Sequence, residues 1–481
     1  MSTAACMVWF RLDLRLDDNP ALHAALRCGL PILPVFIWSP AEESPWAPGA
    51  ASRWWLHQSL NRLDQSLRLL GGRLVIRQGS SPAVLRELVE RDRVRAVFWN
   101  RRSEPALATR DREIREILVR DNVHVEDFNS ALLHEPRAIL NKSGDPFQVF
   151  TPFWRTCLAQ PDPAPSLPCP ERLPGPRQWP SSLKLADLNL EPRLGWAEGI
   201  RQTWTPGEAG AQAALRLFLR EGYAQYDADR DRPDLQGTSR LSPHLHFGEI
   251  SPRQIWHAAR EHSCSLGSPP DAWRRSRFLT ELGWREFAHH LLLHYPHTPE
   301  EPLRPKFNRF PWRQEASWLQ AWQRGLTGYP LVDAGMRELW KTGWMHNRVR
   351  MVVGSFLVKH LLINWREGVR WFWDTLVDAD LANNTLGWQW ISGCGADAAP
   401  FFRIFNPVSQ GEKFDAAGAY VRRWIPELNR LPAAWIHQPW LAPPEILAQA
   451  GVCLDRTYPR PVVSHAIARE VALEAYARLK G

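Results

Sequence analysis

The chain has 481 residues, of which 44% are hydrophobic and 23% charged, and its formal net charge is +8. This length exceeds one ordinary hydrophobic core, so we expect two domains in a globular protein. The excess of basic residues favours a polyanionic partner, because Lys and Arg side chains gain affinity by releasing counterions from phosphates.

The seven cysteines are scattered and form no CxxC pair. This usage is typical of a reduced, intracellular protein without a metal cluster. The first residues lack the pattern of a signal peptide. The most apolar later segment, 351–365, contains Lys359 and His360 and cannot span a bilayer. We therefore expect a cytoplasmic protein with no membrane contact.

The first 130 residues alternate between short apolar runs and amphipathic stretches. The runs have the character of buried parallel strands and cover residues 6–10, 31–38, 73–77, 96–100 and 124–128. Residues 53–70 and 82–91 have helical patterns. Such alternation predicts an α/β fold with a Rossmann-like, doubly wound parallel sheet. No GxGxxG follows the first run, so a nicotinamide-type site is not expected there.

Residues 161–180 contain eight prolines, which excludes a regular helix or a central strand. After about residue 207 the pattern is helical, and 16 of the 26 tryptophans lie after position 250. We predict an α/β domain over residues 1–131, an interdomain linker over 132–206 and a larger all-α domain over 207–481.

The segment GTSRLSPHLHFGEISPRQ, residues 237–254, predicts a helix that begins at Pro243 with Ser242 as its cap. The hydroxyl groups, exposed amides and Arg240 at this helix end could hold a diphosphate. An ordinary capped helix is the alternative.

In ELGWREF, residues 281–287, helical spacing places Glu281, Trp284 and Arg285 on one face. A carboxylate, an indole and a guanidinium together can bind a base edge, stack on it and hold a phosphate. An amphipathic helix with an internal Glu–Arg pair is the alternative. Asn347 and Met351 share a face in the same way and could fit a pyrimidine carbonyl and its methyl group.

In DADLANNTLGWQW, residues 378–390, Asp380 and Asn384 are four residues apart on a helix and can face one ring system. A carboxylate can bind a flavin imide, and an amide can lie near the central flavin nitrogen. The alternative is a solvated face. The apolar, tryptophan-rich surroundings favour burial, provided that Arg350 neutralises one of the two aspartates.

Six segments resemble the photolyase/cryptochrome family, in the family's order and over nearly the whole chain. They are WFRLDLRLDDNPAL (9–22), GTSRLS (237–242), ELGWREF (281–287), TGYPLVDAGMRELWKTGWMHNRVRM (327–351), DADLANNTLGWQW (378–390) and FRIFNPVSQGEKFD (402–415). The resemblance implies an antenna-binding α/β domain and a helical domain that binds FAD and a DNA lesion.

The resemblance also implies roles for individual residues. For FAD binding these are Tyr226, Thr238, Ser239, Arg240, Leu241, Ser242, Phe278, Arg350, Asp378, Ala379, Asp380 and Asn384. Trp388, Trp365 and Trp312 match the electron relay that reduces the flavin in light. The pocket for a cyclobutane pyrimidine dimer matches Glu281, Trp284, Arg285, Asn347, Met351 and Trp390, with Arg230 and Arg348 at the DNA backbone. Glu281 and Asn384, with the relay tryptophans, would act directly in the reaction.

Among family members the chain is most similar to cyclobutane pyrimidine dimer photolyases, which are carbon–carbon lyases. His346 is followed by Asn347 as in those enzymes, and Glu281 is retained. The expected activity is light-dependent dimer repair by a monomer that extrudes the dimer from damaged DNA. The alternatives are a signalling cryptochrome and a light-independent DNA-binding protein. Glu104 matches a position that holds an antenna pterin, so methenyltetrahydrofolate is the expected antenna, with a deazaflavin or an empty site as alternatives.

Overall fold

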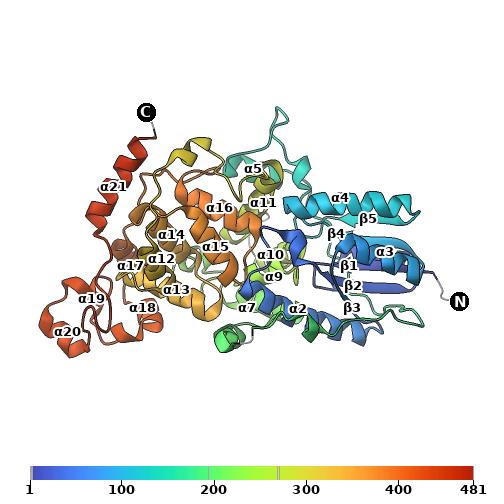
Figure 1. The fold of residues 1–481 in the computed structure, drawn as a ribbon, viewed down its shortest axis with the longest axis horizontal. Helices are drawn as coiled ribbons and strands as arrows, with labels where there is room; N and C mark the ends of the chain where they lie inside the picture. The colour runs from blue at the N-terminus through green and yellow to red at the C-terminus, as the bar shows by residue number, and fades with distance from the viewer. Residues whose placement is uncertain (1–3, 193, 268, 270, 480–481) are drawn as a thin grey trace.

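The computed structural model describes residues 4–192, 194–267, 269 and 271–479. A β-sheet with its covering helices forms one end of the molecule, and a large helical assembly forms the other end (Figure 1). No helix in these described ranges is long and apolar enough to cross a membrane.

The five strands of the sheet are parallel and lie in the order β3-β2-β1-β4-β5. Their bounds are β1 (Ala5–Phe10), β2 (Ile32–Trp38), β3 (Val75–Gln78), β4 (Val94–Asn100) and β5 (His124–Phe128). The chain winds outward from β1 to β3, then returns to place β4 on the other side of β1. This reversal is the topological switch point of a doubly wound sheet, so the predicted fold is confirmed.

Helices cover both faces of the sheet, as the continuous burial of its strands requires. On one face, α1 (Pro20–Arg27) and α2 (Ala50–Leu69) pack against side chains that include Val8 and Phe36. On the other face, α3 (Ser81–Asp92) and α4 (Pro105–Arg120) pack against Trp9 and Val35. Alternate residues of each strand therefore serve two separate cores.

The segment predicted to be a linker has two parts with different structure. Residues 161–180 contain no helix or strand, as their prolines predict. Upstream, α5 (Phe150–Leu158) contributes Phe153 and Trp154 to a hydrophobic core shared with the helical part. The remaining short elements of this segment are η2 (Pro136–Ala138), η3 (Leu185–Leu188), η4 (Gly195–Ala197) and α6 (Glu198–Thr203). The domain boundaries at residues 131 and 206 stay a prediction.

From residue 207 onward the described chain is helical, with isolated bridges as its sole β pairings. Its α-helices are α7 (Glu208–Glu221), α8 (Tyr226–Asp229), α9 (Ser242–His246), α10 (Pro252–Ser265), α11 (Arg277–His294), α12 (Ala316–Arg324), α13 (Pro330–Thr342), α14 (Asn347–Ser355), α15 (Trp365–Thr375), α16 (Leu381–Ser392), α17 (Pro407–Phe414), α18 (Ala419–Trp424), α19 (Ala433–Ile436), α20 (Pro444–Ala450) and α21 (His465–Ala477). A π-helical turn, η7 (Phe356–His360), continues α14. The 3₁₀ turns of this part are η5 (Ala272–Arg275), η6 (Pro305–Arg309), η8 (Pro426–Leu428) and η9 (Pro439–Leu441), and a further 3₁₀ turn, η1 (Pro40–Glu43), follows β2 in the N-terminal part.

The largest core lies among α13, α14, α15 and α16 and contains the fully buried Trp365 and Trp388. Gly368 makes this packing possible, because a Cβ atom there would lie 2.0 Å from the Trp388 ring. The missing side chain lets α15 and α16 approach closely, which fixes the indole of Trp388 at the wall of the site described below.

Buried polar contacts join the two ends of the molecule. The Arg15 guanidinium donates to the backbone oxygens of Asp18, Ser130 and Gly248, the last of which follows α9 in the helical part. The Glu208 carboxylate accepts from the backbone of Leu16 at 3.0 Å. These bonds satisfy buried backbone groups on both sides of the junction and hold the sheet beside the helices.

A buried carboxylate supports the helical core next to the site. Glu338 on α13 accepts a hydrogen bond from the Tyr420 hydroxyl at 2.6 Å and faces the backbone of His346. Burial raises the pKa of Glu338 to about 7, although its hydrogen-bond partners and the neighbouring Arg240 act in the opposite direction. The folded protein therefore favours the protonated form of this carboxyl.

We predict that Glu338→Gln changes the pH dependence of stability. In the unfolded chain Glu338 ionises near its ordinary pKa of 4.5, whereas in the folded protein it ionises near 7. The stabilising contribution of Glu338 to the free energy of unfolding is thus fully present below pH 4.5. It decreases by about 3 kcal/mol as the pH rises to 7. The stability of Glu338→Gln relative to wild type should rise over this window in urea unfolding. If the stability difference between Glu338→Gln and wild type does not vary with pH, the raised pKa of Glu338 is contradicted.

Candidate functional site

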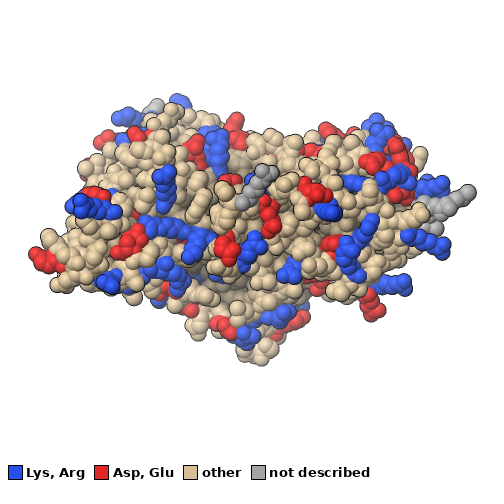
Figure 2. Space-filling view, turned by 60° about the horizontal axis from the view of Figure 1, so that its bottom comes forward, with Lys and Arg blue, Asp and Glu red and all other residues tan. Residues whose placement is uncertain are grey.

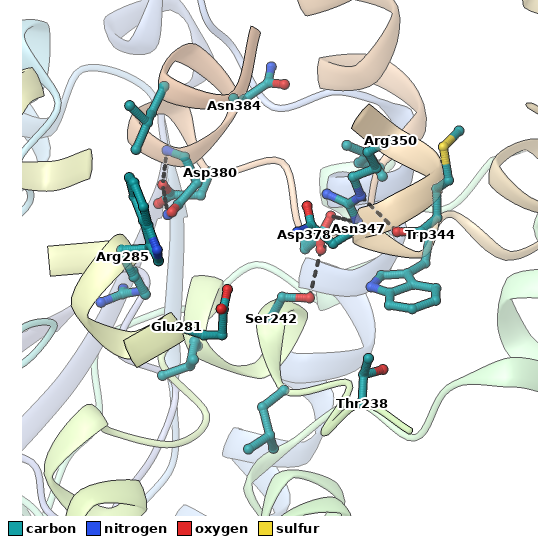
Figure 3. A pocket seen from close by; sticks show the side chains of 18 of the residues that line it. Thr238, Ser242, Glu281, Arg285, Trp344, Asn347, Arg350, Asp378, Asp380 and Asn384 are labelled. Carbon is teal, nitrogen blue, oxygen red and sulfur yellow. Dashed lines mark hydrogen bonds and ion pairs between the residues drawn. The ribbon is translucent and has the colours of Figure 1, made fainter. Parts of the chain in front are cut away.

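A deep cavity of about 570 Å³ opens in the helical part of the molecule, within the size range of cofactor sites. Its walls come from the segment 226–242, α9, α11, α14, α15 and α16. Figure 3 shows the labelled side chains arranged around one open space, with Glu281, Arg285 and Asp380 on one side and Asp378, Arg350 and Trp344 on the other.

Most of the residues predicted for FAD or lesion binding line this cavity. They are Tyr226, Arg230, Thr238, Ser239, Arg240, Leu241, Ser242, Phe278, Glu281, Trp284, Arg285, Asn347, Arg348, Arg350, Met351, Asp378, Asp380, Asn384, Trp388 and Trp390. The motifs from which they were predicted are separated by up to about 150 residues in the chain, and the fold brings them together.

The ion pair between Arg350 and Asp378, with the Ser242 hydroxyl bound to the same carboxylate, links three walls of the cavity. Arg350 on α14 donates to both oxygens of Asp378, at 2.8 and 3.1 Å, and its Nε donates to the Met345 carbonyl. The Ser242 hydroxyl donates to the same carboxylate at 2.6 Å. The expected pairing of Arg350 with Asp378 is present, and the Asp378 side chain is only 4% exposed.

The segment from Thr238 to Ser242 differs from expectation in two details. Helix α9 begins at Ser242 rather than at Pro243, so Ser242 is not its cap, and its hydroxyl is free to bind Asp378. The Arg240 side chain lies between the rings of Trp204 and Trp344, at 4.5 and 4.7 Å. Burial lowers the pKa of Arg240, although the nearby Glu338 carboxyl acts in the opposite direction. The two indole faces add cation–π attraction to the guanidinium.

The residues of this wall fit FAD. Thr238, Ser239 and Ser242 supply hydroxyl groups, and Arg240 contributes a cation whose buried Nε has no hydrogen-bond partner in the structure. Such donors suit a diphosphate. The neighbouring part of the cavity, with Asp378, Asp380, Trp388 and apolar side chains, has the mixed polarity that a flat heteroaromatic ring requires.

Asp380 has two functions in the described structure. One carboxylate oxygen caps α16 by accepting from the backbone and side chain of Asn383, at 2.8 and 2.6 Å. The other lies 3.4 Å from His289 and 3.8 Å from His246. Burial alone would raise the pKa of Asp380, but the two histidines and Arg285 hold it well below its usual value. Asn384, one turn along α16, donates to the Val369 carbonyl at 3.2 Å.

The mouth of the cavity contains two charge pairs. Arg230 donates to Glu281 at 2.5 Å, and Arg348 donates to Asp231 at 2.8 Å. Burial of Arg230 lowers its pKa, but the attraction of Glu281 outweighs this and raises it. Each of the two arginines at the entrance is therefore paired with a carboxylate from another segment.

Trp284 has a fixed orientation because the Phe150 ring stacks on it at 3.8 Å with an interplanar angle of 8°. Arg285 does not pair with Glu281 within the helix. It donates instead to the Ala131 carbonyl, so the alternative of an internal Glu–Arg pair is wrong. The other face of Trp284 lines the cavity.

On the wall formed by α14, His346 caps the helix through a hydrogen bond from the Arg348 backbone to its Nδ1 at 3.2 Å. The cap fixes the first turn, and Asn347 and Met351 both line the cavity as their spacing predicts. Burial lowers the pKa of His346 to about 4, so the imidazole is neutral and can accept this bond.

Four predicted residues lie off the main cavity. Trp365 is fully buried behind it, and Trp312 is half-buried beside Phe310. Ala379 lines a small separate cavity near the sheet. Glu104 is bound by Arg102 through contacts of 2.6 to 3.1 Å at the junction of the two halves.

Sequence reasoning missed four polar or aromatic lining residues. They are His246, Trp344, Phe372 and Asn383, of which all but Phe372 stand inside a motif that had already been identified. Helical spacing could have suggested Asn383 but not Trp344, whose ring packs edge-on against Trp204 from a distant segment. Within the described ranges, no three His, Cys, Asp or Glu side chains are placed to hold a metal ion.

Comparison with known proteins places this site in a family. Residues 6–171 match the model of the DNA photolyase domain, and residues 278–478 match the FAD binding domain of DNA photolyase. The chain is 49% identical to a deoxyribodipyrimidine photo-lyase of Agrobacterium fabrum, over 100% of this chain and 99% of the relative. It is 42% identical to Cryptochrome-1 of Arabidopsis thaliana, over 96% of this chain and 68% of the relative.

Among solved structures, the bacterial class III photolyase of Agrobacterium tumefaciens superposes with a TM-score of 0.96. The two sequences are 48% identical, and the match covers 100% of this chain and 98% of that one. The fold, the FAD-type cavity and these matches agree with the resemblance noted from the sequence motifs. The chain belongs to the photolyase and cryptochrome family of FAD-binding proteins.

Proposed function

We propose that this protein repairs cyclobutane pyrimidine dimers in DNA in a light-dependent reaction, as a deoxyribodipyrimidine photo-lyase. The observation that carries the proposal is that one cavity is lined both by FAD-type residues, such as Arg350, Asp378 and Asp380, and by lesion-type residues, Glu281, Trp284 and Asn347. An electron donor and a planar lesion bound together in this cavity would lie next to each other.

The residues that would hold FAD are those of the segment 238–242 at the diphosphate, and Asp378, Asp380 and Asn384 at the ring system. Bound and fully reduced, FAD supplies the light absorption and the electron that opens the cyclobutane ring, and the electron then returns. The protein's part is to exclude water, fix the ring and hold Asp378 in place through Arg350.

Trp284 and Arg230 support lesion binding for different physical reasons. The Trp284 indole, held by Phe150, offers a rigid stacking face for an extruded pyrimidine pair. Arg230 and Arg348 stand at the mouth, where a DNA phosphate would pass. Figure 2 shows basic side chains around a hollow in one face of the molecule, in keeping with an anionic partner.

The Glu281–Arg230 pair implies an exchange of partners. In the structure the Arg230 guanidinium binds the Glu281 carboxyl group, so this group can reach a dimer carbonyl only when Arg230 turns away. A DNA phosphate at the mouth is a competing partner for Arg230, which would release Glu281 for the lesion. Occupancy of the DNA site would in this way prepare the repair site.

We further propose Trp388, Trp365 and Trp312 as the route by which electrons reach FAD. Indole is the most readily oxidised aromatic ring available here, and the three residues grade from buried to half-buried. Trp388 lines the cavity, whereas Trp312 is accessible to a dissolved reductant.

A blue-light signalling photoreceptor is the second candidate function, and the 42% identity to an Arabidopsis cryptochrome favours it. Such a protein would share the FAD-binding residues but would not need Glu281, Trp284 and Asn347 in the same cavity. The presence of all three on one cavity supports repair.

For the antenna we propose methenyltetrahydrofolate. A cavity of about 340 Å³ beside β4 and β5 is lined by Arg101, Arg102 and Arg112, which suit the carboxylates of a folate tail. Glu104 does not line that cavity, so its predicted contact with the pterin requires release from Arg102.

We also propose that the protein acts as a cytoplasmic monomer.

We predict that wild-type protein with reduced FAD removes the dimer from a single-dimer oligonucleotide in light and not in darkness. Glu281→Ala should lower the repaired fraction per absorbed photon by roughly tenfold or more, because the dimer carbonyl on which charge develops loses its polar partner. Binding of the dimer should fall much less. Glu281→Gln is the matched control, since its amide can hydrogen-bond the same carbonyl.

Equal losses of repair and binding in Glu281→Ala would contradict the role of Glu281. A wild-type protein that binds FAD and repairs nothing would contradict the proposed function and favour the photoreceptor.

Trp312→Phe should block reduction of bound FAD in light while leaving repair by chemically reduced protein intact. The reason is that a phenyl ring is much harder to oxidise than indole. Trp318→Phe, at a nearby partly exposed indole, is the control and should photoreduce normally. Loss of repair after chemical reduction of Trp312→Phe would show that Trp312 is needed for something other than electron supply.

A further inference from the structure

A smaller cavity lies behind the main one, at the junction of the two halves. Its volume is about 30 Å³. This exceeds the roughly 10–15 Å³ that one water molecule needs. Its polar lining comes from both halves of the chain and includes Asn100, Arg102, Ser103, Glu104, His246, Arg285, His289 and Asp380.

Four residues line both cavities: Leu245, His246, Arg285 and Asp380. His289 lines the smaller cavity and does not line the main one. Three of the four residues that separate the proposed FAD site from the junction are therefore ionisable. A partition with no function beyond packing would be expected to be apolar.

The His289 ring connects the partition to the N-terminal half. Its Nδ1 lies 2.7 Å from the Ser103 hydroxyl, and its Nε2 lies 3.4 Å from the Asp380 carboxylate. One nitrogen of the imidazole thus faces a hydroxyl from the junction and the other faces the carboxylate at the FAD cavity. An imidazole in this position can gain a proton at one nitrogen and lose one at the other.

The hydrogen bonding of this cluster is incomplete. His289 is 5% exposed, yet its Nε2 has no hydrogen bond of good geometry in the structure, and the same holds for Nδ1 of His246. Each buried polar atom without a hydrogen-bond partner costs about 1–3 kcal/mol of folding free energy. Both atoms point toward Asp380, which is the arrangement expected where a proton changes its position.

The chemistry of the proposed function requires a proton at this site. Conversion of bound FAD to its reduced form by two thiols takes up two electrons and one proton, while the thiols leave as a disulfide and release the second proton to solvent. The Asn384 amide cannot supply that proton. Asp378 is bound to Arg350 and Ser242, and Glu281 is bound to Arg230, whereas Asp380 faces imidazoles.

We propose that Ser103, His289 and Asp380 form a proton relay from the junction cavity to the FAD cavity, with His246 as a second imidazole beside Asp380. The proposal rests on the proposed function, since it assigns the proton supply for FAD reduction. Asp380 touches the cofactor cavity, and His289 and Ser103 act through it as positioning residues.

The charges around the relay keep the proton off Asp380 at rest. Burial would raise the pKa of Asp380, but His289, His246 and Arg285 lower it well below its usual value. On the junction side, Glu104 faces the same cluster and is neutralised by Arg102. A proton taken from His289 by Asp380 is replaced from the side of Ser103 and the small cavity.

The test follows proton uptake during flash reduction of the FAD-loaded protein, with a pH-indicator dye in weakly buffered solution and with ferrocyanide as the external electron donor, because its oxidation releases no proton. His289→Ala should slow proton uptake by roughly tenfold or more, the scale of a lost acid–base group. Added imidazole should restore the rate by filling the vacated space. Electron arrival, followed by flavin absorbance, should be unchanged in its first phase.

Two further variants keep the proposal falsifiable. Ser103→Ala should slow uptake and should also shift the ¹⁵N resonances of His289 in FAD-loaded protein kept in the dark. His294→Ala is the matched control on the same helix, since His294 lies next to His290 and not Asp380. FAD content and melting temperature show whether each variant is folded.

Wild-type uptake rates in both His289→Ala and Ser103→Ala would overturn the relay. If these variants also repair dimers normally, the proposed function stands and the relay alone is wrong. A wild-type protein that binds no FAD would overturn both.

Discussion

The ion pair between Arg350 and Asp378 is the contact on which the site depends. It joins α14 to the turn between α15 and α16, and the Ser242 hydroxyl adds α9 to the same carboxylate. Removing one partner of a buried pair leaves an uncompensated charge and typically costs about 3–5 kcal/mol. Three chain segments are thereby held at fixed distances, and these distances define the cavity.

Around this clamp the site combines rigid aromatic surfaces with charges that have alternative partners. Trp388 is fixed by the absence of a side chain at Gly368, and Trp284 is fixed by Phe150. By contrast, the partners of Glu281 and Asp380 can change: Arg230 can leave Glu281 for a phosphate, and a proton can move between His289 and Asp380. The rigid rings would position the reacting groups, and the exchangeable charges would respond when DNA, an electron or a proton arrives.

The sequence predicted the architecture well because local patterns determine it. Continuous apolar runs alternating with amphipathic stretches imply a doubly wound sheet, and helical spacing correctly placed Asn347 with Met351 and Glu281 with Trp284 on one cavity. The motif resemblance added the FAD-binding segments that spacing alone could not identify.

Features that depend on long-range packing were not predictable in this way. Arg240 is sandwiched between Trp204 and Trp344, and the Ser103–His289 contact joins residues 186 positions apart. Helix α5 stood within a predicted linker because its neighbours are proline-rich, yet its Phe150 supports Trp284. No local pattern reports such contacts, since each is decided by the docking of the two halves.

The central claim is that FAD and a pyrimidine dimer lie next to each other in one cavity. The most direct measurement is the excited-state lifetime of reduced FAD in the protein, with dimer-containing and with undamaged DNA of the same sequence. Electron transfer to the dimer predicts a clearly shorter lifetime with the damaged DNA alone. A lifetime that is the same with both DNAs, at concentrations where the dimer is bound, would contradict the account.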